Sequence, residues 1–544
     1  MASVVQSVFE SRRATREAAS EPPSEPLVLQ MRPCLAVTSV AVLCLTHRDR
    51  YAETVLAGGI SALALATTAC LARDRVCRVS AAWGRVAYVA AALSLAMFAL
   101  FRDPAGVRWR VPVLTAAAML FIFSACFRRF RAPGLTAVIA ASVAAILGGV
   151  SVFPVTLAFA PRSVFLKLLR MASASCLGVV VAGVLARQFS RRQRWWILAA
   201  ALLAAGGWLR YEAMRASPEP VTDVFVWLRD APGHLMHGIN PYSATYASCY
   251  VTERARKYHL FTTAPQPHPM AYPPLPIVIA LPIRALGFDV RAANIGCDVL
   301  AAFALFAAAC RRGNPFMGLC IAAIYLNLPG VPYLVEQSWY EPMLAALLGT
   351  GLLLSERASR VGRVLLALGI TGKQFGILFL PSLLRGFRRS WRAVLLTTII
   401  VGLALCLPFL IWNPRWFAEL VVWRHLQRPT EFDSSTLFGL AHRRFGWEMP
   451  RILGWTVACL FVGCISWRTP EKGTGIALWM GTSLLGFLLC NPVAHANYFY
   501  LAEYLILLGA AGLAITPEHL ALAATFRPPA CTVPWQPLQS APPQ

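Results

Sequence analysis

Asp223 is the residue best placed for acid–base chemistry. The chain has only eight aspartates, and this one follows the apolar segment 195–209, where a loop meets the bilayer. A carboxylate shielded by lipid and aromatic side chains is suited to take a proton from a hydroxyl nucleophile, as a general base does. The alternative is structural, because Thr222 or Asp223 would also cap a helix that begins at Val224. Asp230, seven residues on, shares the same helical face and would either assist or be solvated.

Lys373 is the second side chain in an unusual place. It interrupts the apolar run LALGITGKQFGILFLP in a chain with only four lysines, and a charge at the bilayer centre costs roughly 2.5–3.5 kcal/mol. The run is predicted to form two half-length helices, 364–372 and 375–384. Gly369 and Gly372 would relieve the turn between them, and Lys373 would face a protein-lined cavity, where phosphate suits a compact cation. The alternative is a snorkelling or ion-paired structural lysine. On the functional interpretation, Lys373→Met should leave stability unchanged or improved.

Four further motifs place polar residues between apolar segments. HGINPY contains Asn240 and Tyr242 and ends a predicted amphipathic surface helix, because its glycine permits a left-handed C-cap and its proline cannot continue a helix. AYPPLP would present Tyr272 to a polar ligand, although its prolines equally suit a plain helix start. The last two motifs are EQSWYEP, with Gln337, and NPVAHANYFY, with His495.

The elements that position these residues are membrane helices. Of the 544 residues, 57% are hydrophobic and 14% are charged, and the mean hydropathy is +0.58. This balance excludes a cytosolic enzyme, a fibrous protein and a secreted disulfide scaffold. At ~20 apolar residues per span, the sequence predicts an all-α polytopic membrane protein with about 12–13 transmembrane helices.

The net charge of +25 is interpreted as a topology signal. The arginines cluster beside helix ends, as the positive-inside rule expects, and form no stripe interleaved with exposed aromatics, so no nucleic acid partner is predicted. Two long loops, 210–270 and 413–450, lie opposite the clusters at 187–194 and 385–392 and are predicted to be extracytoplasmic. Polar residues of the second loop are candidates without a motif: Arg424, His425, Asp433, His442, Arg443 and Arg444.

The fifteen cysteines lie mostly in apolar runs, without a CxxC pair or a Cys/His spacing suited to zinc. The sequence therefore predicts neither a site with metal-ligating residues nor a disulfide framework, and it leaves open whether the reaction uses a divalent metal.

The predicted organisation has four parts. Residues 1–32 form a cytoplasmic N-terminal tail, 33–194 carry additional transmembrane helices without a chemical motif, 195–516 hold all the motifs above, and 517–544 form a disordered tail. In the third part, apolar segments are expected near 195–209, 272–288, 293–310, 316–334, 340–354, 364–372, 375–384, 393–412, 451–466, 474–490 and 497–516.

Taken in chain order, the motifs resemble the polyprenyl-phosphate-sugar-dependent glycosyltransferases of the GT-C fold, and glycosyltransferase family 87 most closely. The resemblance rests on TDVFVWLRDA, HGINPY, AYPPLP, EQSWYEP, GKQFGILFLP and NPVAHANYFY and spans roughly residues 195–516. Two features depart from the family pattern. About six extra helices precede the matching part, and the last motif lacks the aromatic residue that usually precedes the family histidine.

The resemblance implies an inverting transfer of a hexose or pentose, mannose foremost, from a polyprenyl-phosphate donor to a lipid-linked or cell-envelope glycan acceptor. It implies that Asp223 is the catalytic base and that Lys373, alone or with a second-loop arginine, stabilises the lipid phosphate. The substrate-binding residues would be Asp230, Asn240, Tyr242, Tyr272, Gln337, Lys373 and His495. The enzyme would be a multi-pass protein of the cell membrane, among membrane lipids, and would need no cofactor because the lipid-linked sugar is itself a substrate.

Two other classes compete with this interpretation. A transporter or lipid flippase should show internal repeats with matched broken helices, and the sequence shows one break, at Lys373. A non-catalytic membrane scaffold needs neither a buried lysine nor two long loops.

Overall fold

The computed structural model describes residues 190–513, except 258–268, 327–329, 356–358, 428–433, 435, 447, 449, 468 and 470–472. The predicted tails, 1–32 and 517–544, and nearly all of the additional helices predicted over 33–194 lie outside the described residues. The described part is all helical and contains no strand, in agreement with the all-α part of the predicted fold class.

The first half of the described chain begins with a long helix and ends at the turn that carries EQSW. The long helix α8 starts with a capping box between Ser190 and Gln193, several residues before its predicted start. The segment expected as one helix over 316–334 is described as α13 and α14, on either side of 327–329. The elements are α8 (Arg191–Ala216), α9 (Asp223–Met236), η3 (Cys249–Val251), α10 (Glu253–Lys257), α11 (Leu275–Ala285), α12 (Arg291–Arg311), α13 (Pro315–Leu326) and α14 (Gly330–Glu336).

The second half contains the longest apolar helices and the second long loop. Its elements are α15 (Glu341–Ser355), α16 (Arg360–Thr371), η4 (Gln374–Phe379), α17 (Leu380–Gly386), η5 (Arg388–Ser390), α18 (Trp391–Trp412), α19 (Pro414–Ala418), the π-helical turn η6 (Glu419–Trp423), α20 (Arg424–Gln427), α21 (Leu437–Phe445), α22 (Arg451–Trp467), α23 (Ile476–Cys490) and α24 (Ala496–Leu513).

The helices form a bundle whose centre is apolar. Helix α12 packs against α8, α13, α15 and α24, and α15 also packs on α16. Small residues allow this close packing, since the buried face of α12 is largely alanine. By length and composition, two described helical stretches can cross a membrane: Arg291–Arg311, and Arg388–Trp412, which joins η5 to α18. The predicted total of 12–13 spans therefore stays a prediction.

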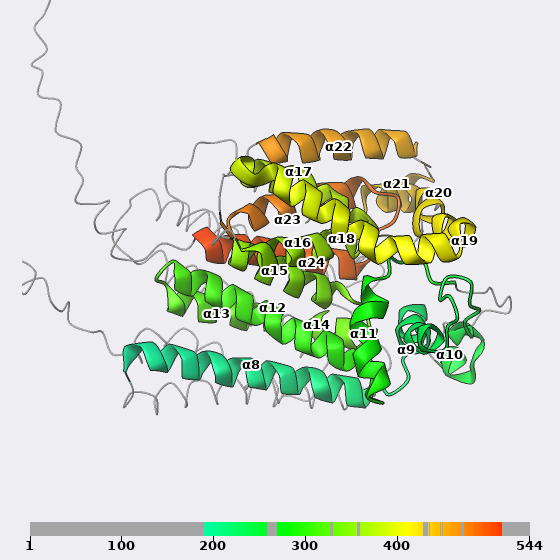
Figure 1. Cartoon of the computed structure of the whole chain (residues 1–544), viewed down its shortest axis with the longest axis horizontal. Coiled ribbons are helices and arrows are strands. Elements are labelled where there is room, and N and C mark those ends of the chain that lie inside the picture. Colours follow the sequence, from blue (N-terminus) through cyan, green and yellow to red (C-terminus); the bar gives the residue numbers. More distant parts are fainter. Residues whose placement is uncertain are drawn as a thin grey trace, which may run out of the picture.

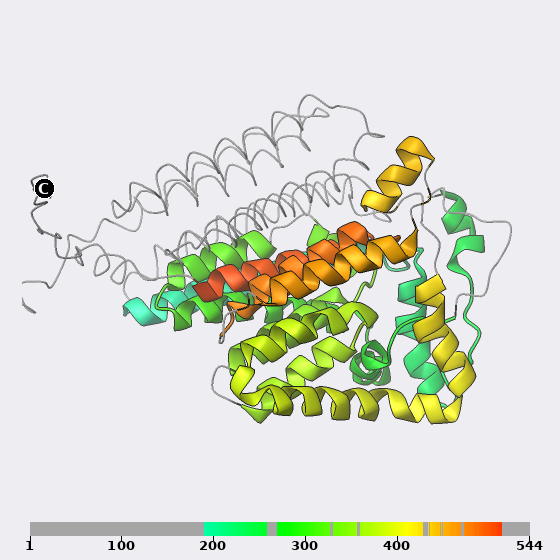
Figure 2. The same cartoon turned by 90° about the horizontal axis from the view of Figure 1, so that it is seen from above.

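The two long loops meet at one end of the bundle. Helices α9 and α10 of the first loop and α19, α20 and α21 of the second all gather there (Figures 1 and 2). The predicted second loop, 413–450, contains the short elements α19, η6, α20 and α21. These helices are four to nine residues long, too short to span a bilayer.

Candidate active site

The backbone breaks at Lys373, as the sequence predicts. Helix α16 ends at Thr371, Lys373 is extended with φ −150° and ψ 146°, and η4 begins at the next residue. The glycines act differently from the prediction. Gly372 has an ordinary φ of −71°, and a Cβ there would meet leucine side chains of neighbouring helices. Gly376 is the glycine that permits the reversal, because a Cβ there would lie 2.0 Å from the carbonyl oxygen of Ile370.

Lys373 is buried and ion-paired. Its side chain is 3% exposed, and Nζ pairs with Oε1 of Glu341, the first residue of α15, whose side chain is 0% exposed. Asn497, in the first turn of α24, donates from Nδ2 to the same oxygen at 2.7 Å. In this structure Lys373 is thus the ion-paired lysine that the sequence left as the alternative. Its role in binding a donor phosphate stays a prediction.

Four aromatic rings surround the ammonium group and form what we call the Lys373 cage. Nζ lies 4.3 Å from the ring centre of Tyr498, 4.8 Å from Tyr340, 5.2 Å from Phe375 and 5.4 Å from Tyr272. Ring faces attract a cation, and the attraction is stronger when water is excluded. The cage and Glu341 together offset the cost of placing this charge inside the bundle.

Tyr272 joins the cage to both long loops. Its ring packs edge-on against Trp227 of α9, at 5.5 Å between centroids, and lies 6.2 Å from the ring of His425 of α20. Its carbonyl oxygen accepts a hydrogen bond from the hydroxyl of Tyr242 at 2.7 Å, so the HGINPY and AYPPLP motifs meet. His425 also bonds the carbonyl oxygen of Ala271 through Nε2 at 2.7 Å. No motif surrounds His425, so the sequence indicates no role for it.

Asp223 is the first residue of α9 and is half-buried. The cap is its neighbour Thr222, whose hydroxyl accepts from the amide of Phe225 at 3.4 Å and donates to the carbonyl oxygen of Gln337 at 3.2 Å. The capping interpretation is therefore confirmed for Thr222. Asp223 accepts from the amide of Val224 at 2.8 Å. One turn along the same helix is Trp227, so the helix that carries Asp223 borders the Lys373 cage.

The other predicted residues lie at varying distances from this cluster. Asp230 forms two hydrogen bonds with Arg229, at 2.7 and 2.9 Å, and this pairing raises the pKa of the Arg229 guanidinium. The carboxamide oxygen of Asn240 accepts from the amide of Tyr242 and shapes the turn. His495 is half-buried with its ring 6.0 Å from that of Tyr498, next to the cage.

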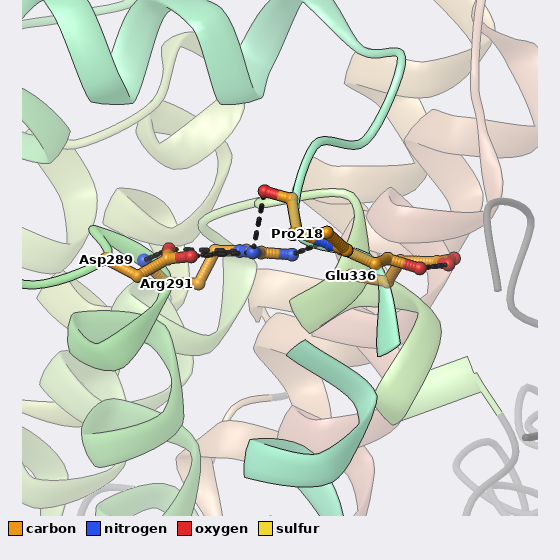
Figure 3. A network of polar contacts seen from close by, with 5 residues as sticks. Pro218, Asp289, Arg291 and Glu336 are labelled. Atoms are coloured by element: carbon orange, nitrogen blue, oxygen red, sulfur yellow. Dashed lines mark hydrogen bonds and ion pairs between the residues drawn. The ribbon is translucent and has the colours of Figure 1, made fainter. Parts of the chain in front are cut away.

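Gln337 belongs to a polar network beneath Asp223. Its amide donates to Glu336, which also accepts from the hydroxyl of Ser217. Arg291, 1% exposed at the start of α12, donates to the carbonyl oxygens of Ser217 at 2.6 Å and Pro218 at 3.4 Å and pairs with Asp289 at 2.6 Å (Figure 3). This network fixes the chain that leads from α8 to Asp223 against α12 and α14.

Comparison with known proteins places part of this site in a family. Residues 271–492 match glycosyltransferase family 87. The resemblance noted in the sequence is thereby confirmed over this segment. No curated protein and no solved structure matches the chain.

The family 87 segment contains Tyr272, Gln337, Glu341 and Lys373, so the cage and its ion pair are largely built from matched residues. Asp223 precedes the match, as do the other residues of the first long loop, and His495 follows it. Their roles stay predictions that rest on the geometry above.

The surroundings of Asp223 include the segment after HGINPY. Burial, and then the charge of Asp223, raises the pKa of the Cys249 thiol to about 12. Burial and Asp223 likewise raise the pKa of Tyr250. The η3 turn therefore lies close enough to Asp223 for the carboxylate charge to act on both side chains. Across the described residues, no group of three His, Cys, Asp or Glu side chains has the geometry to hold a metal ion.

Proposed function

We propose that this protein is an integral-membrane glycosyltransferase that transfers a hexose or pentose, mannose foremost, from a polyprenyl-phosphate donor. The acceptor is a lipid-linked or cell-envelope glycan, and the reaction takes place on the extracytoplasmic face of the cell membrane. The family 87 match indicates a glycosyltransferase. The donor, the acceptor, the topology and a catalytic unit spanning 195–516 belong to the proposal.

The observation that carries the proposal is the meeting of a carboxylate helix with a buried cationic cage. Helix α9, which begins with Asp223, packs on α11, which begins within AYPPLP, and its Trp227 packs against Tyr272 of the cage. A base and a cation are the two groups that displacement of a phosphate from a sugar requires.

In the proposed mechanism, Asp223 accepts the proton of an acceptor hydroxyl. The oxygen attacks the anomeric carbon from the face opposite the phosphate, so a new C–O bond forms as the bond to the lipid phosphate breaks, and the configuration inverts. The polyprenyl phosphate leaves with both electrons of the broken bond. Lys373 and the positive N-terminal ends of α15 and α24 stabilise the negative charge on that phosphate.

The remaining site residues hold the elements in place in this scheme. Tyr242 bonds the backbone of Tyr272, and Gln337 receives the cap of α9. Asn240 shapes the turn after α9, while Asp230 pairs with Arg229 and the ring of His495 lies beside that of Tyr498.

A transfer assay with a donor panel tests the proposal. Membranes containing the full chain are incubated with radiolabelled polyprenyl-phosphate mannose, glucose or arabinose, and with the matching nucleotide sugars as controls. We expect label from one lipid-linked sugar to move into a lipid or glycan product, and none from nucleotide sugars when the supply of polyprenyl phosphate is blocked. Transfer directly from a nucleotide sugar, or none from any lipid donor, would overturn the proposal.

A further inference from the structure

Three buried polar atoms next to Lys373 have no hydrogen-bond partner among the described residues. They are Oε2 of Glu341, Oδ1 of Asn497 and the hydroxyl of Tyr340. The side chains are 0%, 4% and 2% exposed. A buried polar group without a partner costs about 1–3 kcal/mol, so three around one ion pair point to a ligand that completes them.

The chemistry of these atoms selects the ligand. The amide of Asn497 must present Nδ2 to Glu341, because only the nitrogen can donate to the carboxylate, and this leaves Oδ1 as an acceptor. Oε2 of an ionised Glu341 is also only an acceptor. Two acceptors and a hydroxyl require a ligand that donates O–H or N–H bonds. Phosphate oxygens accept hydrogen bonds, so they do not satisfy this set.

The charge and the shape of the surroundings restrict the class of ligand further. Lys373 already balances the charge of Glu341, so a cationic ligand would be repelled by the ammonium group. The side chains around these atoms are aromatic. The ring centroids of Tyr272 and Tyr340 lie 5.1 Å apart, and those of Phe375 and Tyr498 lie 5.5 Å apart. A neutral polyol with one apolar C–H face and several hydroxyl donors fits both the rings and the acceptors. A pyranose has this composition.

We infer that Glu341, Asn497 and Tyr340 form the recognition site for the hydroxyls of the transferred sugar, with the Lys373 cage as its stacking wall. This inference rests on the proposed function and deepens it. In this arrangement Lys373 acts on two parts of the donor. Through its ion pair it orients Glu341 toward the sugar hydroxyls, and its ammonium group faces the phosphate attached to that sugar.

The test compares binding of sugar-bearing and sugar-free lipids. Affinities of the full chain in nanodiscs are measured for polyprenyl phosphate and for its mannose, glucose and arabinose forms. We expect at least one sugar lipid to bind more tightly than bare polyprenyl phosphate. Glu341→Gln should reduce that preference about 10- to 100-fold, and Tyr340→Phe, which keeps the Glu341–Lys373 pair, should reduce it about three- to tenfold with binding of bare polyprenyl phosphate unaffected.

Two variants keep the result interpretable. Tyr340→Phe retains the Glu341–Lys373 pair, so it tests the sugar site even if Glu341→Gln does not fold. Tyr504→Phe is the matched control, because it removes a buried hydroxyl of α24 that bonds the carbonyl oxygen of Ala301 outside the cage, and it should leave the preference unchanged. A preference for the sugar lipid that survives in both Glu341→Gln and Tyr340→Phe would overturn the sugar site. An equal loss of affinity for sugar-free and sugar-bearing lipids would do the same, and either result would leave the proposed function standing. Failure of every lipid to bind the wild-type chain would overturn both.

Discussion

Replacing Lys373 by methionine should destabilise the protein, contrary to the expectation from sequence. That expectation treats the lysine as an isolated buried charge whose removal relieves a cost. The structure gives the charge a partner, because Nζ pairs with Oε1 of Glu341 and both side chains are buried. Lys373→Met alone leaves the carboxylate inside the bundle without its counter-ion.

The magnitude follows from the burial of the pair. Breaking a buried ion pair by removing one partner costs about 3–5 kcal/mol, whereas replacing both partners is often neutral or stabilising. In the single variant, Glu341 keeps only the 2.7 Å hydrogen bond from Asn497. In the double variant Lys373→Met/Glu341→Gln, the amide oxygen at position 341 still accepts that bond and no charge remains. The double variant should therefore recover about 2 kcal/mol or more relative to Lys373→Met.

Thermal unfolding of the wild type, both single variants and the double variant in one detergent measures this coupling. We expect Lys373→Met and Glu341→Gln each to lower the melting temperature by several degrees, and the double variant to lie between them and the wild type. Lys373→Arg serves as the charge-preserving control. Additive losses in the double variant, or a Lys373→Met protein as stable as the wild type, would show that the ion pair does not hold the cage together.

Further predictions concern the chain reversal, the surroundings of Asp223 and the cap of α9. Gly376→Ala should destabilise the fold severely, because its Cβ would lie 2.0 Å from a backbone oxygen; Gly233→Ala, with nothing within 4 Å of its Cβ, is the control, and equal melting temperatures would contradict the close approach. The Cys249 thiol, with its pKa raised to about 12, should alkylate slowly at pH 8 and about tenfold faster per pH unit above it. Asp223→Asn lowers that pKa and should speed alkylation at fixed pH, measured by mass spectrometry; an unchanged rate would place the carboxylate elsewhere. Thr222→Ala should cost about 1–2 kcal/mol in thermal stability, since it removes both the cap and the hydrogen bond to Gln337, the residue after α14; no loss would argue against that link.

The break at Lys373 was predictable from sequence, while its partners were not. A lysine in an apolar run costs free energy at the centre of a bilayer, and glycines beside it permit a break in the helix. Both features can be recognised from the neighbouring residues alone. Glu341 lies 32 residues away and Asn497 lies 156 residues from Glu341. Pairings over such separations depend on how α15 and α24 pack, which no local pattern encodes. The assignment of the turn to Gly369 and Gly372 rather than Gly376 fails for the same reason, since the contact to Ile370 arises only after the chain folds back.

The first long loop was better predicted than the second. An amphipathic period, a Thr cap and a glycine at the C-terminal end define α9 locally, and Gly238 adopts the left-handed conformation, with φ +71°. The 413–450 region contains short helices, among them the π-helical turn η6, which are too short to leave a clear period. His425 reaches Ala271 from this region, and only the fold reveals that contact.

The central claim is that Asp223 is the base of a lipid-linked sugar transfer. Rates of transfer from the donor that the panel identifies are measured for the wild type, Asp223→Asn and Asp230→Asn, each at matched membrane abundance. Asp223→Asn should lower the rate about 10²- to 10⁴-fold with normal accumulation, because Thr222 supplies the helix cap, and Asp230→Asn, whose carboxylate pairs with Arg229, should lower it far less. Near-normal transfer by Asp223→Asn, or a reversed ranking of the two variants, would contradict the assignment.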